Sequence, residues 1–137
     1  MSELVPAALR DFARRRAGFR CEYCLIHEDD CTYPHEIDHI ISRKHGGESD
    51  EANLAWACFV CNRLKGSDIA SIDIETGKLA RLYHPRKDRW NKHFRLNGPR
   101  IEPLTNVGRV TEHLLQVDHP YNVQLRKELL SKGLFPL

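Results

Sequence analysis

The chain has 137 residues, the length of one domain, and 41% of them are hydrophobic, so it can bury a core of modest size. Its formal net charge of +2 decides nothing about a nucleic-acid partner, because local clustering of basic residues indicates such a partner. No apolar run reaches membrane-spanning length, and Glu3, Pro6 and Asp11 interrupt the one apolar patch near the N-terminus. With neither a spanning run nor a signal-peptide pattern, we expect a cytoplasmic protein.

The first predicted element is a helix over residues 6–17. Proline is compatible with its first turn, and apolar residues recur at helical spacing on one face: Leu9, Phe12, Ala13 and Ala17. The other face carries an arginine cluster: Arg14, Arg15 and Arg16. Such a cluster is suited to a phosphate backbone, and a solvated polar face is the alternative.

The cysteines indicate a metal site. Four of the five form two Cys-x-x-Cys pairs: Cys21 with Cys24, and Cys58 with Cys61. In a reducing cytosol such pairs indicate metal ligands more often than disulfides. Four thiolates satisfy tetrahedral Zn²⁺ and leave no open position, so we expect a structural zinc site. Cys31, in a polar loop over residues 25–34, is expected to remain an unliganded thiol.

Between the two pairs lies the stretch that holds the main candidate catalytic side chains, Glu36 to Ile41. Its isoleucines favour an extended backbone, in which successive side chains point to opposite faces. Asp38 and His39 would therefore diverge, so that one can hold a metal while the other faces a substrate.

A loop and two short elements follow. Gly46 and Gly47 allow a tight reversal, in which Arg43 is placed to approach a phosphate. Residues 49–51 resemble a helix start, so we expect a short helical segment over residues 53–57. A further helix should begin at Cys61, with Asn62 in its first turn.

The composition changes near Ser71, and we expect a turn over residues 73–78 followed by an extended segment. Residues 81–100 contain seven Lys/Arg and one acid, interleaved with Tyr83, Trp90 and Phe94. This pattern is typical of a nucleic-acid contact surface, and the alternative is a solvated face with its aromatics in the core. Residues 106–116 and 121–132 show helical periodicity. We expect one module over residues 1–70, which includes the N-terminal helix, and an extension packed on it over 71–137.

The order Cys-x-x-Cys, Glu-Ile-Asp-His-Ile-Ile, Gly-Gly, Asn-Leu and Cys-x-x-Cys-Asn-x-x-Lys-Gly resembles the HNH endonuclease family over residues 19–67. The resemblance implies an α+β fold with a ββα-metal core and a structural four-cysteine zinc. His39 corresponds to the family's first His, Asn53 to its middle Asn, and Asn62 to a last position that is often His. The tail around residues 85–94 is similar to an extension found on a bacterial subset of the family.

The resemblance implies a nuclease acting on nucleic acid, and we expect double-stranded DNA. His39 would be the general base, while Asp38 and Asn62 would bind a catalytic divalent cation. Because Asn62 supplies oxygen in place of nitrogen, Mg²⁺ is expected, with Mn²⁺ or Ni²⁺ as alternatives. Asn53 would orient the His39 loop, and Arg43 and Lys65 would contact phosphate.

Two other classes of protein remain open. A non-catalytic zinc-ribbon module that binds nucleic acid would need the four cysteines and the basic clusters, but it has no use for Asp38, His39 and Asn62 together. A thiol redox protein would need one exposed thiolate of low pKa at Cys21 or Cys24. Zinc content separates the redox protein from the other two. The sequence does not determine the oligomeric state.

Overall fold

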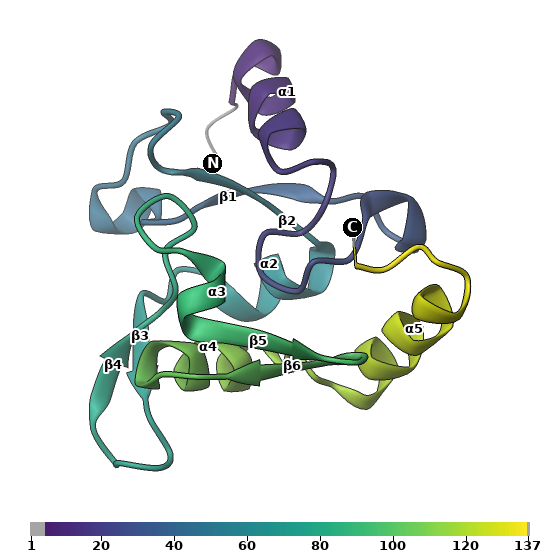
Figure 1. Cartoon of the computed structure of the whole chain (residues 1–137). Helices are drawn as coiled ribbons and strands as arrows, with labels where there is room; N and C mark the ends of the chain where they lie inside the picture. The colour runs from purple at the N-terminus through teal and green to yellow at the C-terminus, as the bar shows by residue number, and fades with distance from the viewer. Residues whose placement is uncertain (1–4, 137) are drawn as a thin grey trace.

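The computed structural model describes residues 5–136 and combines helices with short strands (Figure 1), which confirms the α+β class. Glu3 lies outside the described residues. The helices are α1 (Ala7–Arg16), α2 (Phe59–Lys65), α3 (Trp90–His93), α4 (Asn106–Leu115) and α5 (Pro120–Ser131), with single turns η1 (Glu28–Asp30) and η2 (Arg43–His45). The strands are β1 (Glu36–His39), β2 (Leu54–Ala57), β3 (Ala70–Ile72), β4 (Leu79–Arg81), β5 (Phe94–Asn97) and β6 (Arg100–Pro103). No helix in this part of the chain is long and apolar enough to cross a membrane.

The centre of the fold is β1, β2 and α2. The two strands pair antiparallel, with Glu36 opposite Ala57 and His39 opposite Leu54. α2 begins two residues after β2, with Cys58 as its N-cap, and contacts β1. In Figure 1, α1 lies above the strand pair and α2 below it. The predicted ββα core is therefore present.

One predicted element of this core is wrong, because residues 54–57 form strand β2 rather than a helical segment. All four residues of β2 are buried, and each is paired with a residue of β1. Ser49, the expected helix cap, lies against the His39 ring instead. Alanines at positions 55 and 57 favour a helix locally, but pairing with β1 and burial on both faces outweigh that preference.

The C-terminal half continues the same core. Buried aromatic and aliphatic residues of this half join those around the cysteines in one cluster: Tyr83, Phe94, Ile101, Val107, Leu115 and Val117. Trp90 packs on Phe94 with ring centroids 5.1 Å apart, and its indole N–H donates to the Tyr23 carbonyl oxygen. The aromatics interleaved with the basic residues 81–100 therefore belong largely to the interior.

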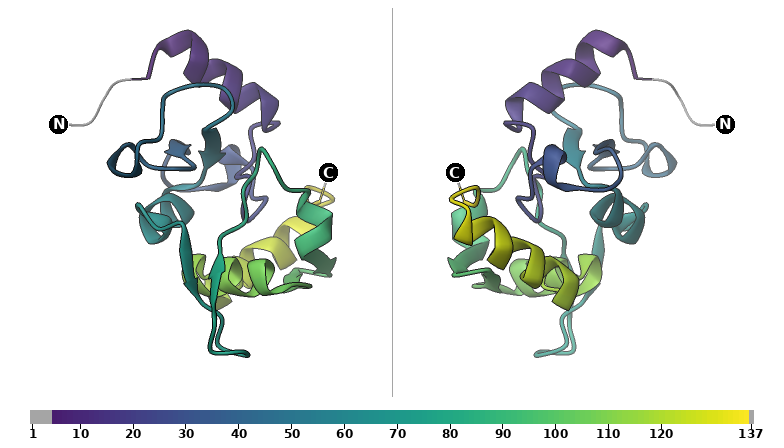
Figure 2. Two further views of the ribbon diagram at one scale, coloured as in Figure 1. Left: turned by 90° about the vertical axis from the view of Figure 1, so that its left-hand side faces the viewer. Right: turned by 90° about the vertical axis from the view of Figure 1, so that its right-hand side faces the viewer.

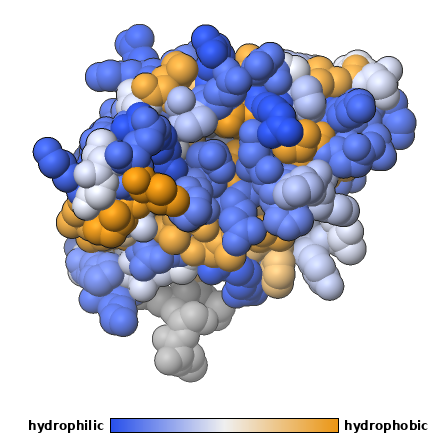
Figure 3. Space-filling view, turned by 90° about the horizontal axis from the view of Figure 1, so that it is seen from below, coloured by the Kyte–Doolittle hydropathy of each residue, from blue (hydrophilic) through white to orange (hydrophobic). Residues whose placement is uncertain are grey.

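The β3–β4 hairpin projects from the body of the molecule (Figure 2). Its pairing is antiparallel, and it is tied to α4 at the start of its turn, where Asp73 accepts hydrogen bonds from Arg109 at 2.9 and 3.0 Å. The face seen from below is mostly hydrophilic, with apolar side chains at its left and further ones across its centre and upper part (Figure 3). On the hairpin, the exposed apolar residues are Ile72, Ile74 and Leu79.

Candidate active site and metal centre

The four paired cysteines converge as predicted. Their Sγ atoms all lie within 4.8 Å of one another and are buried, and no other group of three or more metal-binding side chains occurs within residues 5–136. The Sγ atoms of Cys24 and Cys58 are 3.8 Å apart. A tetrahedron with Zn–S bonds of about 2.3 Å has edges of about 3.8 Å, so the donor set fits zinc.

Local backbone geometry prepares each pair to bind the metal. The backbone N–H of Cys24 donates to Cys21 Sγ at 3.4 Å, and that of Cys61 donates to Cys58 Sγ at 3.3 Å. Hydrogen bonds from Cys21 and the other two thiols lower the pKa of Cys58. Cys31 lies outside this group, and burial raises the pKa of its thiol to about 12. A thiol of that pKa is protonated at neutral pH, as expected for an unliganded cysteine.

Asp38 and His39 diverge along β1, as the alternation of a strand requires. The Asp38 carboxylate turns toward α2, where Lys65 lies. The His39 ring turns toward the loop that follows β1, and its Nε2 lies 2.8 Å from Ser49 Oγ. The two side chains therefore face different partners, one in the interior and one at the strand end.

Asp38 is one side of a buried polar cluster. Tyr23 donates its hydroxyl to Asp38 Oδ2 at 2.6 Å, and Lys65 Nζ donates to Oδ1 at 3.0 Å. Lys65 also donates to the carbonyl oxygens of His39 and Ile40 at 3.2 and 3.0 Å. Burial raises the pKa of Asp38, and the Lys65 ammonium opposes that shift.

These contacts bear on two predictions. The side chains of Asp38 and Lys65 are only 3% and 2% exposed. The three Lys65 donors are all used inside the protein, so a contact with phosphate would require Lys65 to release these acceptors. Both Asp38 oxygens accept hydrogen bonds from Tyr23 and Lys65, so binding a cation would likewise require Asp38 to exchange a partner, and both roles stay predictions.

A different carboxylate lies beside Asn62. The Asn62 Nδ2 donates to Glu36 Oε1 at 2.8 Å, and Arg63 donates to Glu36 Oε2 at 3.2 Å. The Glu36 side chain is 32% exposed, in contrast to that of Asp38. Sequence reasoning missed Glu36, although the period of a strand places it on the same face as Asp38, two residues away.

Asn53 closes the loop that carries Ser49. Its Oδ1 accepts from the Ile41 backbone N–H, and its Nδ2 donates to the carbonyl oxygens of Ile41 and Glu48, each at 2.9 Å. Gly47 allows this closure, because a Cβ there would lie 1.7 Å from the Ile41 oxygen. The amide of Asn53 therefore contacts backbone, which brings Ser49 close to His39.

The N-terminal arginine cluster is used mainly within the protein. Arg14 pairs with Glu28 at 2.7 Å, and Arg15 with Asp11 at 2.8 Å. Arg16 donates to the carbonyl oxygens of Glu51 and Leu54, which ties α1 to β2. Arg43, exposed in η2, donates to the Gly47 oxygen at 3.2 Å. Arg14 and Arg16 therefore contribute to the fold, and a contact of this face with a phosphate backbone stays a prediction.

Three arginines of the second basic cluster, residues 81–100, are also paired within the protein. Arg81 pairs with Asp88 and Arg95 with Glu102, at 2.6 and 2.7 Å. Arg86 pairs with Glu22, which also accepts from the Trp56 backbone N–H. Since its aromatics lie inside and these arginines have carboxylate partners, this segment joins the two halves of the fold.

Comparison with known proteins identifies the central segment. Residues 21–68 match the family model described as HNH endonuclease, which confirms the resemblance over the part of the chain that holds the four cysteines, β1, β2 and α2. No curated protein and no solved structure matches the chain.

Proposed function

We propose that the HNH module of residues 21–68 makes this chain a metal-dependent endonuclease that hydrolyses phosphodiester bonds in double-stranded DNA, with His39 as general base. The family implies nuclease activity in general. The observation that carries the specific proposal is the position of His39, held by Ser49 at the end of β1, together with the Glu36–Asn62 pair that joins β1 to α2.

Ser49 positions the imidazole of His39, because its Oγ lies 2.8 Å from Nε2 at the end of β1. The neutral ring takes the proton from the attacking water. A neutral imidazole is suited to this role, which typically contributes ~10²–10⁴ in rate.

The Glu36–Asn62 pair is the donor set that suits a hard cation. Nδ2 of Asn62 donates a hydrogen bond to Glu36. The Oδ1 of Asn62 and the partly exposed carboxylate of Glu36 then present oxygen ligands. Oxygen donors favour Mg²⁺ or Mn²⁺, with Ni²⁺ as a weaker fit. Such a cation supplies charge neutralisation at the phosphate and the leaving oxygen. Asp38 would contribute only after releasing Lys65.

Replacing His39 with alanine tests the proposal. The variant should keep its zinc, fold and DNA affinity, while Mg²⁺-dependent plasmid cleavage falls by ~10² or more, since the base is missing. His45→Ala, in exposed η2, is the matched control and should cleave normally. Wild-type cleavage by His39→Ala would overturn the mechanism. A wild-type protein that binds but never cleaves would favour the zinc-ribbon binding module.

Ser49→Ala should lower single-turnover cleavage by about tenfold, the expected effect of one lost hydrogen bond on a catalytic group. The imidazole ¹⁵N shifts of His39 should change from one dominant tautomer to a mixture. Ser49→Thr, which keeps the hydroxyl, should restore both. Unchanged ¹⁵N shifts in Ser49→Ala would show that Ser49 does not position the base.

A further inference from the structure

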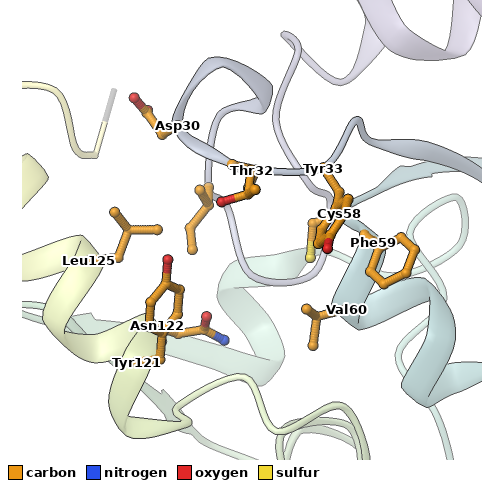
Figure 4. Close-up of a pocket in the computed structure, with 11 residues that line it drawn as sticks. Asp30, Thr32, Tyr33, Cys58, Phe59, Val60, Tyr121, Asn122 and Leu125 are labelled. Atoms are coloured by element: carbon orange, nitrogen blue, oxygen red, sulfur yellow. The ribbon is translucent and has the colours of Figure 1, made fainter.

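A cavity of about 250 Å³ lies outside the candidate active site, between α5 and the first turn of α2 (Figure 4). Tyr121, Asn122 and Leu125 of α5 form one wall. Tyr33, Phe59 and Val60 form the opposite wall. Cys58, one of the four predicted zinc ligands, also lines the cavity, whereas the six side chains named above have no role in the zinc centre or in the proposed chemistry.

The two walls present aromatic rings that folding leaves exposed. Tyr33 stacks on Phe59 with ring centroids 4.8 Å apart and an interplanar angle of 31°. The exposed fractions of Tyr33 and Tyr121 are nonetheless 59% and 66%. Two large, accessible rings on opposite sides of a cavity form a stacking site for a flat ligand.

A continuous line of contacts joins the cavity to the candidate active site. The Arg63 guanidinium lies over the Phe59 ring, 4.5 Å from its centroid, and pairs with Glu36 at 3.2 Å. Phe59, Asn62 and Arg63 lie within about one helical turn, ~5.4 Å along the axis. A nucleotide with its phosphate near Glu36 and Asn62 therefore has this cavity within reach of its base, with Arg63 between them.

We propose that this cavity binds an unpaired nucleobase next to the phosphate that is cleaved. The inference rests on the proposed function. Every base has a flat π face that stacks on aromatic side chains, while a base inside a duplex is already stacked on its neighbours and must be extruded. Polar groups lie at the same site. Nδ2 of Asn122 donates to the Gln116 and Val117 carbonyl oxygens, which leaves its Oδ1 to accept from a base edge, and Thr32 also lines the cavity.

Fluorescence of a single 2-aminopurine in a short single-stranded oligonucleotide tests the site. The full-length, zinc-loaded protein is used with His39→Ala so that the strand stays intact. Binding should quench the probe and be weakened about tenfold by Tyr33→Ala or Tyr121→Ala, because each removes a stacking surface. Tyr33→Phe keeps the ring and should restore affinity. Leu79→Ala, exposed on β4, is the control and should bind normally.

The result that overturns the inference is an oligonucleotide with an abasic position binding as tightly as the intact one, or quenching that both tyrosine variants leave unchanged. Plasmid cleavage by the protein with its own His39, measured in parallel with Mg²⁺, separates the two proposals. If the protein cleaves the plasmid but does not quench the probe, the nucleobase site is contradicted and the proposed nuclease activity is supported. Quenching without cleavage supports the base site in a protein that binds nucleic acid and does not cut it.

Discussion

Replacing Cys58 with serine is expected to release zinc and unfold the centre of the protein. Structural zinc contributes an apparent ~10–16 kcal/mol, and the whole free energy of unfolding of a domain is about 5–15 kcal/mol. The four thiols belong to the same buried cluster as Tyr83, Phe94 and Leu115. Loss of the metal should therefore unfold both halves of the chain together, as measured by circular dichroism and zinc content.

Cys31→Ser is the matched control, because Cys31 is partly buried near the same cluster but is not one of the four ligands. It should retain about one zinc per chain and melt close to the wild-type temperature. A Cys58→Ser protein that is folded, free of zinc and active would contradict the structural role of the metal. Equal zinc loss from both variants would place Cys31 in the site.

The elements that could be predicted from the sequence are those whose signal is local. The periodicity of α1, α4 and α5 and the two Cys-x-x-Cys pairs each need only a few neighbouring residues. The helix predicted for the residues of β2 was wrong. The alanines of this segment favour a helix locally, but its strand depends on pairing with β1, nearly twenty residues earlier in the chain. Propensity is a weak guide where tertiary pairing decides the backbone.

The roles of the charged residues depended on partners that are distant in the chain. Arg14 reaches Glu28, and Arg86 reaches Glu22, 64 residues away. Basic residues that contact nucleic acid cannot be distinguished in sequence from basic residues that are solvated or paired with acids, because only the fold shows which acids lie beside them. In the candidate site, His39 and Asn53 could be found from the motif, whereas the different surroundings of Glu36 and Asp38 depend on Lys65 pointing inward from α2.

Asp38→Ala is expected to destabilise the protein by about 3–5 kcal/mol, because it leaves the Lys65 ammonium buried without its carboxylate. The Tyr23 hydroxyl loses its acceptor as well. The free energy of unfolding measured in urea should show this loss. Asp38→Ala combined with Lys65→Met, which removes both charges, should recover much of the lost stability. Removing one partner of a buried ion pair leaves an unpaired charge in the core, whereas replacing both partners by apolar groups does not.

Glu36→Gln, on the same face of β1, gives the contrasting result that separates fold from cation binding. Its carboxylate is partly exposed, so stability should change by no more than about 0.5 kcal/mol. Cleavage should fall because a charged ligand is lost, and raising the Mg²⁺ concentration should recover part of it by mass action. Cleavage by Asp38→Ala should not respond to Mg²⁺ in this way, because its defect is an unpaired ammonium in the core. If Asp38→Ala is instead as stable as wild type and regains cleavage at high Mg²⁺, then Asp38 is the cation ligand and Lys65 releases it when the metal binds.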